Sequence, residues 1–249
     1  MKRVPWPRTA LLVLIAALAP VTASAAGGFT PAERAEIVQI VREALKQDPS
    51  ILRDAVAAMQ AESTRAAIDA VRDKLVTPAD AFVGNPKADV TIVEFFDTRC
   101  PYCRAMEPTM ENFIATRPDV RLVYKDMPVL GPASVLGSKA LLAAQHQGAY
   151  AQMRKAVMQL PPNTTLEMIH AAADKLGLDW DRLSRDMNSA EVKQRIAENL
   201  NLARQLGIDG TPAMVIGDRM IQGAVDPAHL QGAVAGAAKA HAAGQSHTK

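Results

Sequence analysis

Cysteine is scarce in this sequence, whose 249 residues contain only two, Cys100 and Cys103. One pair in a chain of this length is not a disulfide scaffold. A bridge across two intervening residues closes a very small loop and constrains the unfolded chain little. We therefore expect the pair to react or to bind a metal rather than to hold the fold together.

Further metal ligands are equally sparse. A structural zinc site needs about four ligands, and the two cysteines supply half of them. The histidines are single and far apart along the chain: His146, His170, His229, His241 and His247. Zinc is therefore disfavoured, whereas a soft monovalent ion such as Cu(I) can be held by two thiolates alone.

No apolar run is long enough to cross a membrane. The run near the N-terminus, residues 10–19, has ten residues, whereas a transmembrane helix needs about 20. It follows the basic residues Lys2 and Arg3 and precedes Ala23-Ser24-Ala25-Ala26, which is the pattern of a cleaved secretory signal peptide. We expect residues 1–26 to be removed on export and the mature protein to be periplasmic.

The mature chain also lacks an excess of positive charge. The predicted leader carries Lys2, Arg3 and Arg8 and no acid. The rest has 25 Lys and Arg against 26 Asp and Glu, so its formal charge is −1, compared with +2 for the whole sequence. Polyanions bind basic surfaces, so the composition argues against a nucleic-acid partner.

Residues 27–76 have a helical pattern throughout. Thr30-Pro31-Ala32-Glu33 is a capping box with proline at the first helical position, and Asp48 can cap a second helix. Two apolar stripes recur at helical spacing: Ile37, Ile40, Val41, Ala44 and Leu45, then Leu52, Ala55, Val56, Met59, Val71 and Leu75. Either the stripes pack on the rest of the chain, or they pair with copies of themselves. Two successive stripes exceed what one domain face needs, so we expect a homo-oligomer through residues 30–76.

Residues 77–243 are predicted to form an α/β domain. The β-branched and aromatic run at residues 90–96 predicts a buried central strand. An amphipathic helix follows Cys103, and residues 119–125 predict a second strand. A strand, a helix and a strand in so short a span predict a βαβ unit with parallel strands.

The second half of this domain is predicted to contain a helical insertion and a hairpin. Residues 133–206 show several helical patterns and no strand pattern. Two short runs, 213–216 and 219–222, flank a Gly-Asp turn and predict the hairpin. A last alanine-rich helix follows, and the polar tail 244–249 is expected to be disordered.

The proline between the two cysteines predicts different roles for them. With Pro101 as the first helical residue, Cys100 is the N-cap and Cys103 lies inside the first turn. The sulfur of Cys100 is then expected to face the free N–H groups of that turn, where the positive end of the helix favours a thiolate. Cys100 is thus the predicted attacking sulfur, and the more buried Cys103 is predicted to resolve the mixed disulfide.

Glu94 is an unexpected charge in an otherwise apolar strand. A buried carboxylate needs a partner or a raised pKa. Glu94 either faces an edge, pairs with a lysine such as Lys125, or lies beneath the cysteines and handles protons. Thr211-Pro212, just before the predicted hairpin, would by itself be an ordinary turn.

Together these motifs resemble the thioredoxin-fold family. Cys100-Pro101-Tyr102-Cys103 follows an apolar strand, and Gly210-Thr211-Pro212 precedes a late hairpin. The order of a βαβ unit, a helical insertion and a ββα unit is similar to the DsbA-like branch. The Glu94-Phe95-Phe96-Asp97 lead-in and the Met127-Pro128-Val129-Leu130-Gly131 segment resemble ScsC-type and Com1-type members, which carry a helical N-terminal extension.

The resemblance implies a DsbA-like thioredoxin fold and thiol–disulfide exchange. Cys100 would be the nucleophile and Cys103 the resolving thiol. Pro212 would be a cis-proline facing them, Thr211 would bond to the client backbone, and Glu94 would be the buried acid. The redox-active Cys100–Cys103 disulfide would serve without any other cofactor.

The implied partners are exported proteins that contain cysteine, and a membrane protein that reoxidises or reduces the pair. The Pro101-Tyr102 dipeptide and Thr211 depart from the DsbA oxidase, so isomerase and oxidase both remain open. Four methionines, Met106, Met127, Met153 and Met214, either line a client surface or fill the core. Two other functions stay open: copper binding by the same two thiols, and an assembly module formed by the N-terminal helices.

Overall fold

A computed structural model describes residues 29–246 of the chain. The predicted signal peptide, residues 1–26, lies outside the described residues, as do residues 247–249. The chain forms two compact units, the first ending at Asp54 and the second beginning at Ala55. No described helix is long and apolar enough to cross a bilayer.

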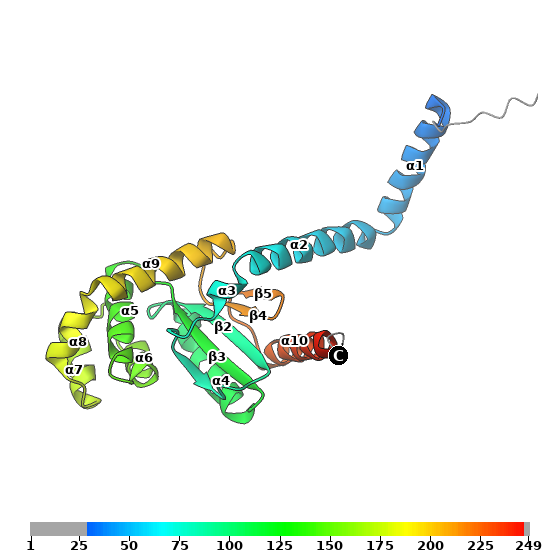
Figure 1. The fold of residues 1–249 in the computed structure, drawn as a ribbon. Helices are drawn as coiled ribbons and strands as arrows, with labels where there is room; N and C mark the ends of the chain where they lie inside the picture. The colour runs from blue at the N-terminus through cyan, green and yellow to red at the C-terminus, as the bar shows by residue number, and fades with distance from the viewer. Residues whose placement is uncertain (1–28, 247–249) are drawn as a thin grey trace, which may run out of the picture. The chain divides into compact units, whose positions relative to one another are not determined.

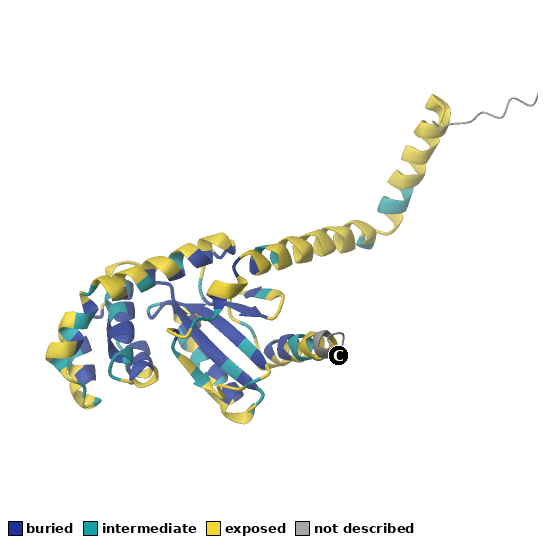
Figure 2. Ribbon diagram, viewed as in Figure 1, coloured by how far each residue is buried: buried dark blue, intermediate teal, exposed yellow. Residues whose placement is uncertain are grey.

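The first unit contains helix α1, Pro31–Gln47, and the start of helix α2, Ser50–Ala70. The predicted capping box is present: the Glu33 amide donates to the Thr30 hydroxyl, and the Thr30 amide donates to the Glu33 carboxylate. No residue of α1 is buried, and Figure 2 shows the helix exposed along nearly all its length. The predicted apolar stripe of α1 is therefore open to solvent in the described chain.

The second predicted stripe divides between exposed and buried residues. Leu52 and Met59 are exposed, whereas Val71 and Leu75 are buried against Val93 and Phe95 and other residues of the sheet and α9. Ile68, which was not part of the predicted stripe, is buried with them. Helix α3, Arg72–Leu75, carries the last of them. The core of the second unit thus begins before residue 77, the predicted start of the domain, because these side chains cover one face of the sheet.

The second unit is built on a mixed sheet in the order β1-β3-β2-β4-β5. Its strands are β1 Phe82–Gly84, β2 Val90–Phe96, β3 Val120–Asp126, β4 Ala213–Ile216 and β5 Arg219–Gln222. The central strand β2 pairs parallel with β3, and β4 forms an antiparallel hairpin with β5, which confirms both predictions. Strand β1 pairs antiparallel with β3 and was not predicted, because three residues are too few to show an alternating pattern.

Helices cover both faces of this sheet (Figure 1). Helix α4, Pro101–Thr116, connects β2 to β3. The predicted insertion consists of α5 Pro132–Gln145, α6 Tyr150–Met158, α7 Leu166–Lys175, α8 Trp180–Met187 and α9 Ala190–Gln205. Helix α10, Pro227–Ser246, follows the hairpin. It runs through residues 244–246, which the sequence predicted to be part of a disordered tail; alanine, the best helix former, dominates the preceding turns.

Alternate residues of β2 face opposite sides of the sheet. Ile92 and Phe96 belong to the core shared with α4, the insertion and α10, whereas Val93 and Phe95 belong to the core on the other side. Both faces are covered, which explains the continuous apolar run of this strand. By the same alternation, Glu94 lies on the face of Ile92 and Phe96.

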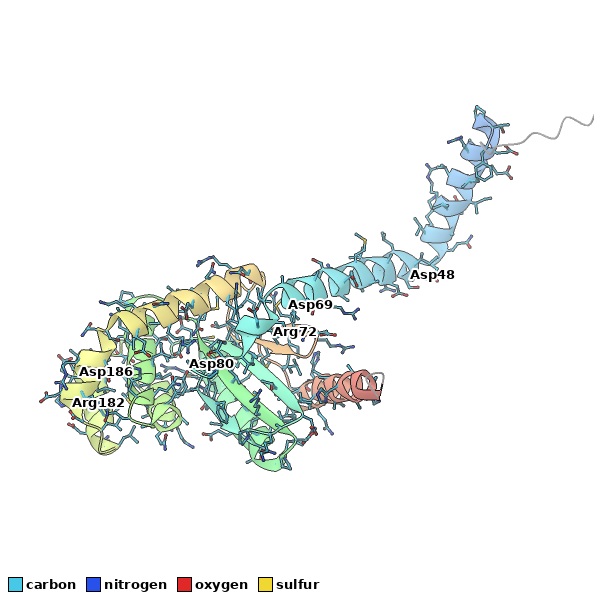
Figure 3. All side chains as sticks on the ribbon, in the orientation of Figure 1. Asp48, Asp69, Arg72, Asp80, Arg182 and Asp186 are labelled. Atoms are coloured by element: carbon cyan, nitrogen blue, oxygen red, sulfur yellow. The ribbon has the colours of Figure 1, made fainter. Side chains whose placement is uncertain are left out.

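Polar contacts tie the segment around α3 to the sheet. Lys125 of β3 is buried and lies 2.8 Å from the Asp80 carboxylate. Arg72 bonds to Asp69 at 2.5 Å and to Asp218, between β4 and β5, at 2.7 Å. Figure 3 labels Asp69, Arg72 and Asp80 in this segment. Because Lys125 is engaged by Asp80 on the other face of the sheet, it is not the partner of Glu94.

Candidate active site

The two cysteines lie where β2 gives way to α4. Cys100 is the N-cap and Pro101 is the first helical residue, as predicted. Both cysteines are free thiols and both are buried, with exposed fractions of 3% for Cys100 and 0% for Cys103. The side chain of Tyr102, between them, is 65% exposed. Solvent therefore meets the motif at the two residues between the cysteines, Pro101 and Tyr102.

The sulfur of Cys100 does not cap the helix in the predicted way. No side-chain capping hydrogen bond is present at this residue. The thiol donates instead to the carbonyl oxygen of Thr211, 3.1 Å from Sγ. The prediction considered only the local helix end, whereas a loop from elsewhere in the chain supplies a closer acceptor.

Strand pairing brings that loop to the cysteines. Antiparallel pairing sets Phe95, near the end of β2, opposite Ala213 at the start of β4. The residues just before β4 therefore meet the residues just after β2. The Thr211–Pro212 peptide bond is cis, as the resemblance implied, and Pro212 is buried.

Glu94 is buried in the core that also contains both cysteines, with 1% of its surface exposed. Burial raises the pKa of Glu94, while the positive charge of Arg154 lowers it. The Arg154 guanidinium lies 3.3 Å from Glu94 Oε2. The two alternatives in which Glu94 faces an edge or pairs with Lys125 are therefore wrong.

Arg154, from α6 of the insertion, is the centre of a buried charged cluster. It also pairs with Glu107 of α4, and its guanidinium lies 4.5 Å from the ring centre of Phe96 and 4.3 Å from that of Tyr124. Aromatic faces attract a cation, and the two carboxylates balance its charge. The insertion thus supplies the cation that pairs with the buried Glu94.

The surroundings of Cys103 favour its protonated form. Burial raises the pKa of the Cys103 thiol well above its usual range, and a hydrogen bond with the Asp97 backbone lowers it. The negative charge of Glu94 and the neighbouring Cys100 raise the pKa further. Cys103 therefore stays a thiol until a nearby base accepts its proton, and Glu94 is close enough to act on it electrostatically.

Three buried charged residues near the site were not assigned a role from the sequence: Asp97, Asp126 and Arg154. Asp97 was noticed only as part of the motif that resembles the family. Arg154 follows Met153 and precedes Val157, both buried on α6. A charge inside the apolar pattern of a helix was thus the available signal. Asp126 ends a strand, where a polar residue is ordinary.

Asp126 lies next to Phe96 in the sheet register and is 1% exposed. Burial raises its pKa to about 7, although the Tyr150 hydroxyl, donating at 2.6 Å, lowers it. An aspartate in the unfolded chain has a pKa of about 3.9. Because the folded-state pKa is the higher one, the contribution of this group to stability is complete below pH 4 and is lost as the pH rises through about 7.

Replacing Asp126 by asparagine is expected to remove this pH dependence. Each pKa unit corresponds to about 1.4 kcal/mol, so the free energy of unfolding of the wild type should fall by up to about 4 kcal/mol between pH 4 and pH 7. Urea unfolding at a series of pH values measures this fall in the free energy of unfolding. The control Asp119→Asn, at a half-buried aspartate that pairs with Arg117, should keep the wild-type slope between pH 4 and pH 7. An equally steep slope in Asp126→Asn would contradict the prediction.

The structure decides between the two predicted roles of the methionines, and it also shows whether potential metal ligands are grouped together. Met106, Met127, Met153 and Met214 are all buried, so they fill the core and do not line a client surface. Within residues 29–246, no three or more His, Cys, Asp or Glu side chains are grouped to hold a metal ion.

The fold and the position of the cysteine pair define a class, the thioredoxin-fold domains with a helical insertion after the βαβ unit. The family model of the DSBA-like thioredoxin domain matches residues 91–235. The chain belongs to this family of thiol–disulfide exchange proteins.

Solved structures agree with this assignment. A thioredoxin-like oxidoreductase from Silicibacter pomeroyi is 40% identical, with a TM-score of 0.63, over 66% of this chain and 94% of that one. A linker-deletion mutant of Proteus mirabilis ScsC is 29% identical, with a TM-score of 0.66, over 85% of this chain and 97% of that one. A periplasmic thioredoxin-like protein from Salmonella enterica serovar Typhimurium is 32% identical, with a TM-score of 0.60, over 66% of this chain and 92% of that one.

The first curated relatives are much longer proteins. They are sodium/proton antiporters of Salinispora species, and the chain spans 24% of their length. The match therefore concerns one part of those proteins.

Proposed function

We propose that the chain is a periplasmic thiol:disulfide oxidoreductase that exchanges disulfides with exported proteins through Cys100 and Cys103. One observation carries the proposal: the Cys100 thiol lies 3.1 Å from the Thr211 carbonyl, beside Pro212, in a DSBA-like domain. A sulfur in that position can meet a client disulfide and a client backbone together. The export signal predicted at residues 1–26 and the periplasmic Salmonella neighbour support the location.

The exchange runs through two substitutions at sulfur. The Cys100 thiolate attacks one sulfur of a client disulfide, the client S–S bond breaks, and the departing client thiolate takes up a proton. Cys103 then loses its proton and attacks the Cys100 sulfur of the mixed disulfide. The second client thiolate leaves, so the client gains two electrons and the Cys100–Cys103 pair is oxidised. Oxidation of a client is the same sequence in reverse, and a membrane partner resets the pair.

Glu94 is the proposed acceptor of the Cys103 proton. Burial raises the pKa of both groups, so Glu94 takes up a proton more readily than a carboxylate in water does, and Cys103 gives up its proton only to a base close by. Neither group is open to bulk solvent, so an internal base is needed for the second substitution. Arg154 stabilises the ionised form of Glu94 and keeps it able to accept.

Thr211 is the proposed contact for the client backbone. It is half-buried beside Cys100, and its carbonyl accepts the weak hydrogen bond of the thiol. An extended client segment can pair with the backbone of Thr211 in the way that a strand adds to a sheet edge. This pairing would hold a client sulfur against Cys100 without reading side chains.

The assay that tests the function uses ribonuclease in two forms, with oxidised and reduced glutathione as the redox buffer. Recovery of activity from reduced ribonuclease measures oxidation, and recovery from scrambled ribonuclease measures isomerisation. We expect catalysis of both, with the larger acceleration on the scrambled form if the protein is an oligomer. A wild-type protein that accelerates neither form would overturn the proposal.

The exposed stripe of α1 supports a homo-oligomer. Ile37, Val38, Ile40 and Val41 are between 38% and 61% exposed within the described chain. An apolar stripe of this kind on a soluble surface marks an interaction site. Several active sites facing one cleft would suit isomerisation, in which a wrong disulfide must be attacked and then released.

Substituting Ile40 by glutamate is expected to dissociate the oligomer. A charge in a packed apolar seam loses its hydration without gaining a partner. Light scattering after size exclusion should show the mass falling to that of a monomer. The matched control is Gln39→Glu, which adds the same charge on the face of α1 opposite Ile37, Val41 and Ala44 and should leave the mass unchanged. A wild-type protein that is already monomeric would refute the oligomer.

A further inference from the structure

Asp97 joins the cysteine motif to a distant loop. It follows β2 directly and is 0% exposed. Its Oδ1 accepts the Arg99 amide at 2.8 Å. Its Oδ2 accepts the amides of Val129 at 2.8 Å and Leu130 at 3.0 Å. One carboxylate therefore binds the residue before Cys100 and the middle of the loop 127–131.

The backbone of Asp97 serves the cysteines themselves. Its carbonyl oxygen accepts the Cys100 amide at 3.1 Å, and a hydrogen bond with its backbone lowers the pKa of the Cys103 thiol. These contacts do not involve the carboxylate. A side-chain substitution at Asp97 can therefore disturb the loop while it leaves the backbone contacts of the cysteines in place.

The loop 127–131 depends on this carboxylate at its centre. Its first amide, of Met127, donates to the Phe96 carbonyl at 2.8 Å, and Gly131 at its end has a φ of 104° and precedes α5. Between these ends, the amides of Val129 and Leu130 both reach Asp97. Hydrogen bonds to an ionised group are about twice as strong as neutral ones, so Asp97 determines where this stretch lies.

The loop carries two exposed apolar side chains close in structure to the cysteine motif. Val129 is 45% exposed and Leu130 is 47% exposed, although the amides of both are anchored. Tyr102, on the motif itself, is 65% exposed. The shared carboxylate brings the backbone amides of Val129 and Leu130 close to the amide of Arg99, the residue before Cys100. A client segment that reaches Cys100 would therefore meet these side chains.

We propose that Asp97 is a positioning residue for client binding, through the apolar side chains that it holds beside Cys100. This inference rests on the proposed exchange activity and adds a preference: client segments with apolar residues next to the reacting cysteine. Asp97 acts through Val129 and Leu130 and touches no reacting atom with its carboxylate. Small disulfides, which reach Cys100 without touching the loop, are outside its influence.

The test uses Asp97→Asn and three disulfide substrates: oxidised glutathione and two peptides that differ only in having leucine or serine beside the cysteine. An asparagine keeps the shape but replaces one acceptor oxygen by an N–H donor, which faces amide donors. We expect the KM for the leucine peptide to rise about tenfold, equivalent to about 1.4 kcal/mol. The rate with glutathione and the kcat for either peptide should stay within about twofold of the wild type.

A second variant covers the case in which Asp97→Asn does not fold. Val129→Ala with Leu130→Ala truncates exposed side chains and leaves the amides bonded to Asp97. It should lose the same preference for the leucine peptide. The control Asp80→Asn removes another buried carboxylate, the partner of Lys125 on the other face of the sheet, and should lower stability without changing the peptide preference.

The outcomes separate this inference from the function it rests on. A wild type that prefers the leucine peptide, with the preference lost in both variants, supports the inference. Unchanged KM values in Val129→Ala/Leu130→Ala would overturn it, as would a parallel loss of glutathione and peptide rates in Asp97→Asn. A wild type that reacts with none of the three substrates would instead overturn the proposed exchange activity, and the inference with it.

Discussion

Substituting Cys100 by serine is expected to abolish disulfide exchange. A serine hydroxyl in the same place cannot form the mixed disulfide, so no step after it can occur. Loss of a covalent nucleophile costs a thousandfold or more, roughly, in turnover. The ribonuclease assay should fall to the rate of the glutathione buffer alone. Retained catalysis would show that the exchange does not pass through Cys100.

Substituting Cys103 by serine should give a different defect. Cys100 can still attack, but nothing inside the protein resolves the product, so mixed disulfides accumulate. A gel without reductant should show them as bands that vanish when reductant is added. The same bands should be missing in Cys100→Ser, which makes the two variants controls for each other. If neither variant traps a client, the proposed order of attack is wrong.

Substituting Arg154 by methionine is expected to cost about 3–5 kcal/mol of stability, the usual cost of breaking a buried ion pair from one side. The change leaves Glu94 and Glu107 without their shared cation. Solvent cannot replace that cation, because the side chains of Arg154 and Glu94 are only 3% and 1% exposed. The free energy of unfolding in urea measures the loss. The matched control is Lys155→Met. Lys155 is the next residue of α6 and pairs with Glu111 on the exposed surface, so this substitution should hardly change the urea concentration at which half of the protein is unfolded.

The pH dependence of the Arg154→Met variant tests the cause. Arg154 lowers the pKa of Glu94 against the raising effect of burial, so its removal should raise the folded-state pKa further above the unfolded value. A raised folded-state pKa means that stability is lost as the pH rises. The defect should therefore be small below pH 4 and grow towards neutral pH. Adding Glu94→Gln should restore part of the stability at pH 7, and a defect of equal size at every pH would contradict this account.

Much of the fold could be predicted from local patterns in the chain. The β-branched run of β2, the proline at the start of α4 and the spacing to β3 predicted a parallel βαβ unit around the cysteines, and the structure has it. The capping box at Thr30 and the β4–β5 hairpin were equally local. Each depends on residues within a few positions of one another, where periodicity and capping act.

Errors arose where the deciding partner was distant. The sequence suggested the helix N–H groups as the neighbours of the Cys100 sulfur, but Thr211, 111 residues away, is closer. It suggested Lys125 as one partner for Glu94, but strand alternation places Lys125 on the other face and Arg154, 60 residues away, supplies the cation. The short strand β1 had no detectable pattern at all.

The sequence by itself determined the chemistry available to this protein: one cysteine pair, with proline after the first cysteine, at the junction of a buried strand and a helix. The tertiary structure decided which groups surround that pair. Sheet pairing brought the Thr211 carbonyl to Cys100, the helical insertion supplied Arg154 as the partner of Glu94, and the Asp97 carboxylate tied the loop 127–131 to the residue before Cys100. The physical reason is that local conformation follows from neighbouring residues, whereas charge, burial and contact at a site depend on which distant faces pack together.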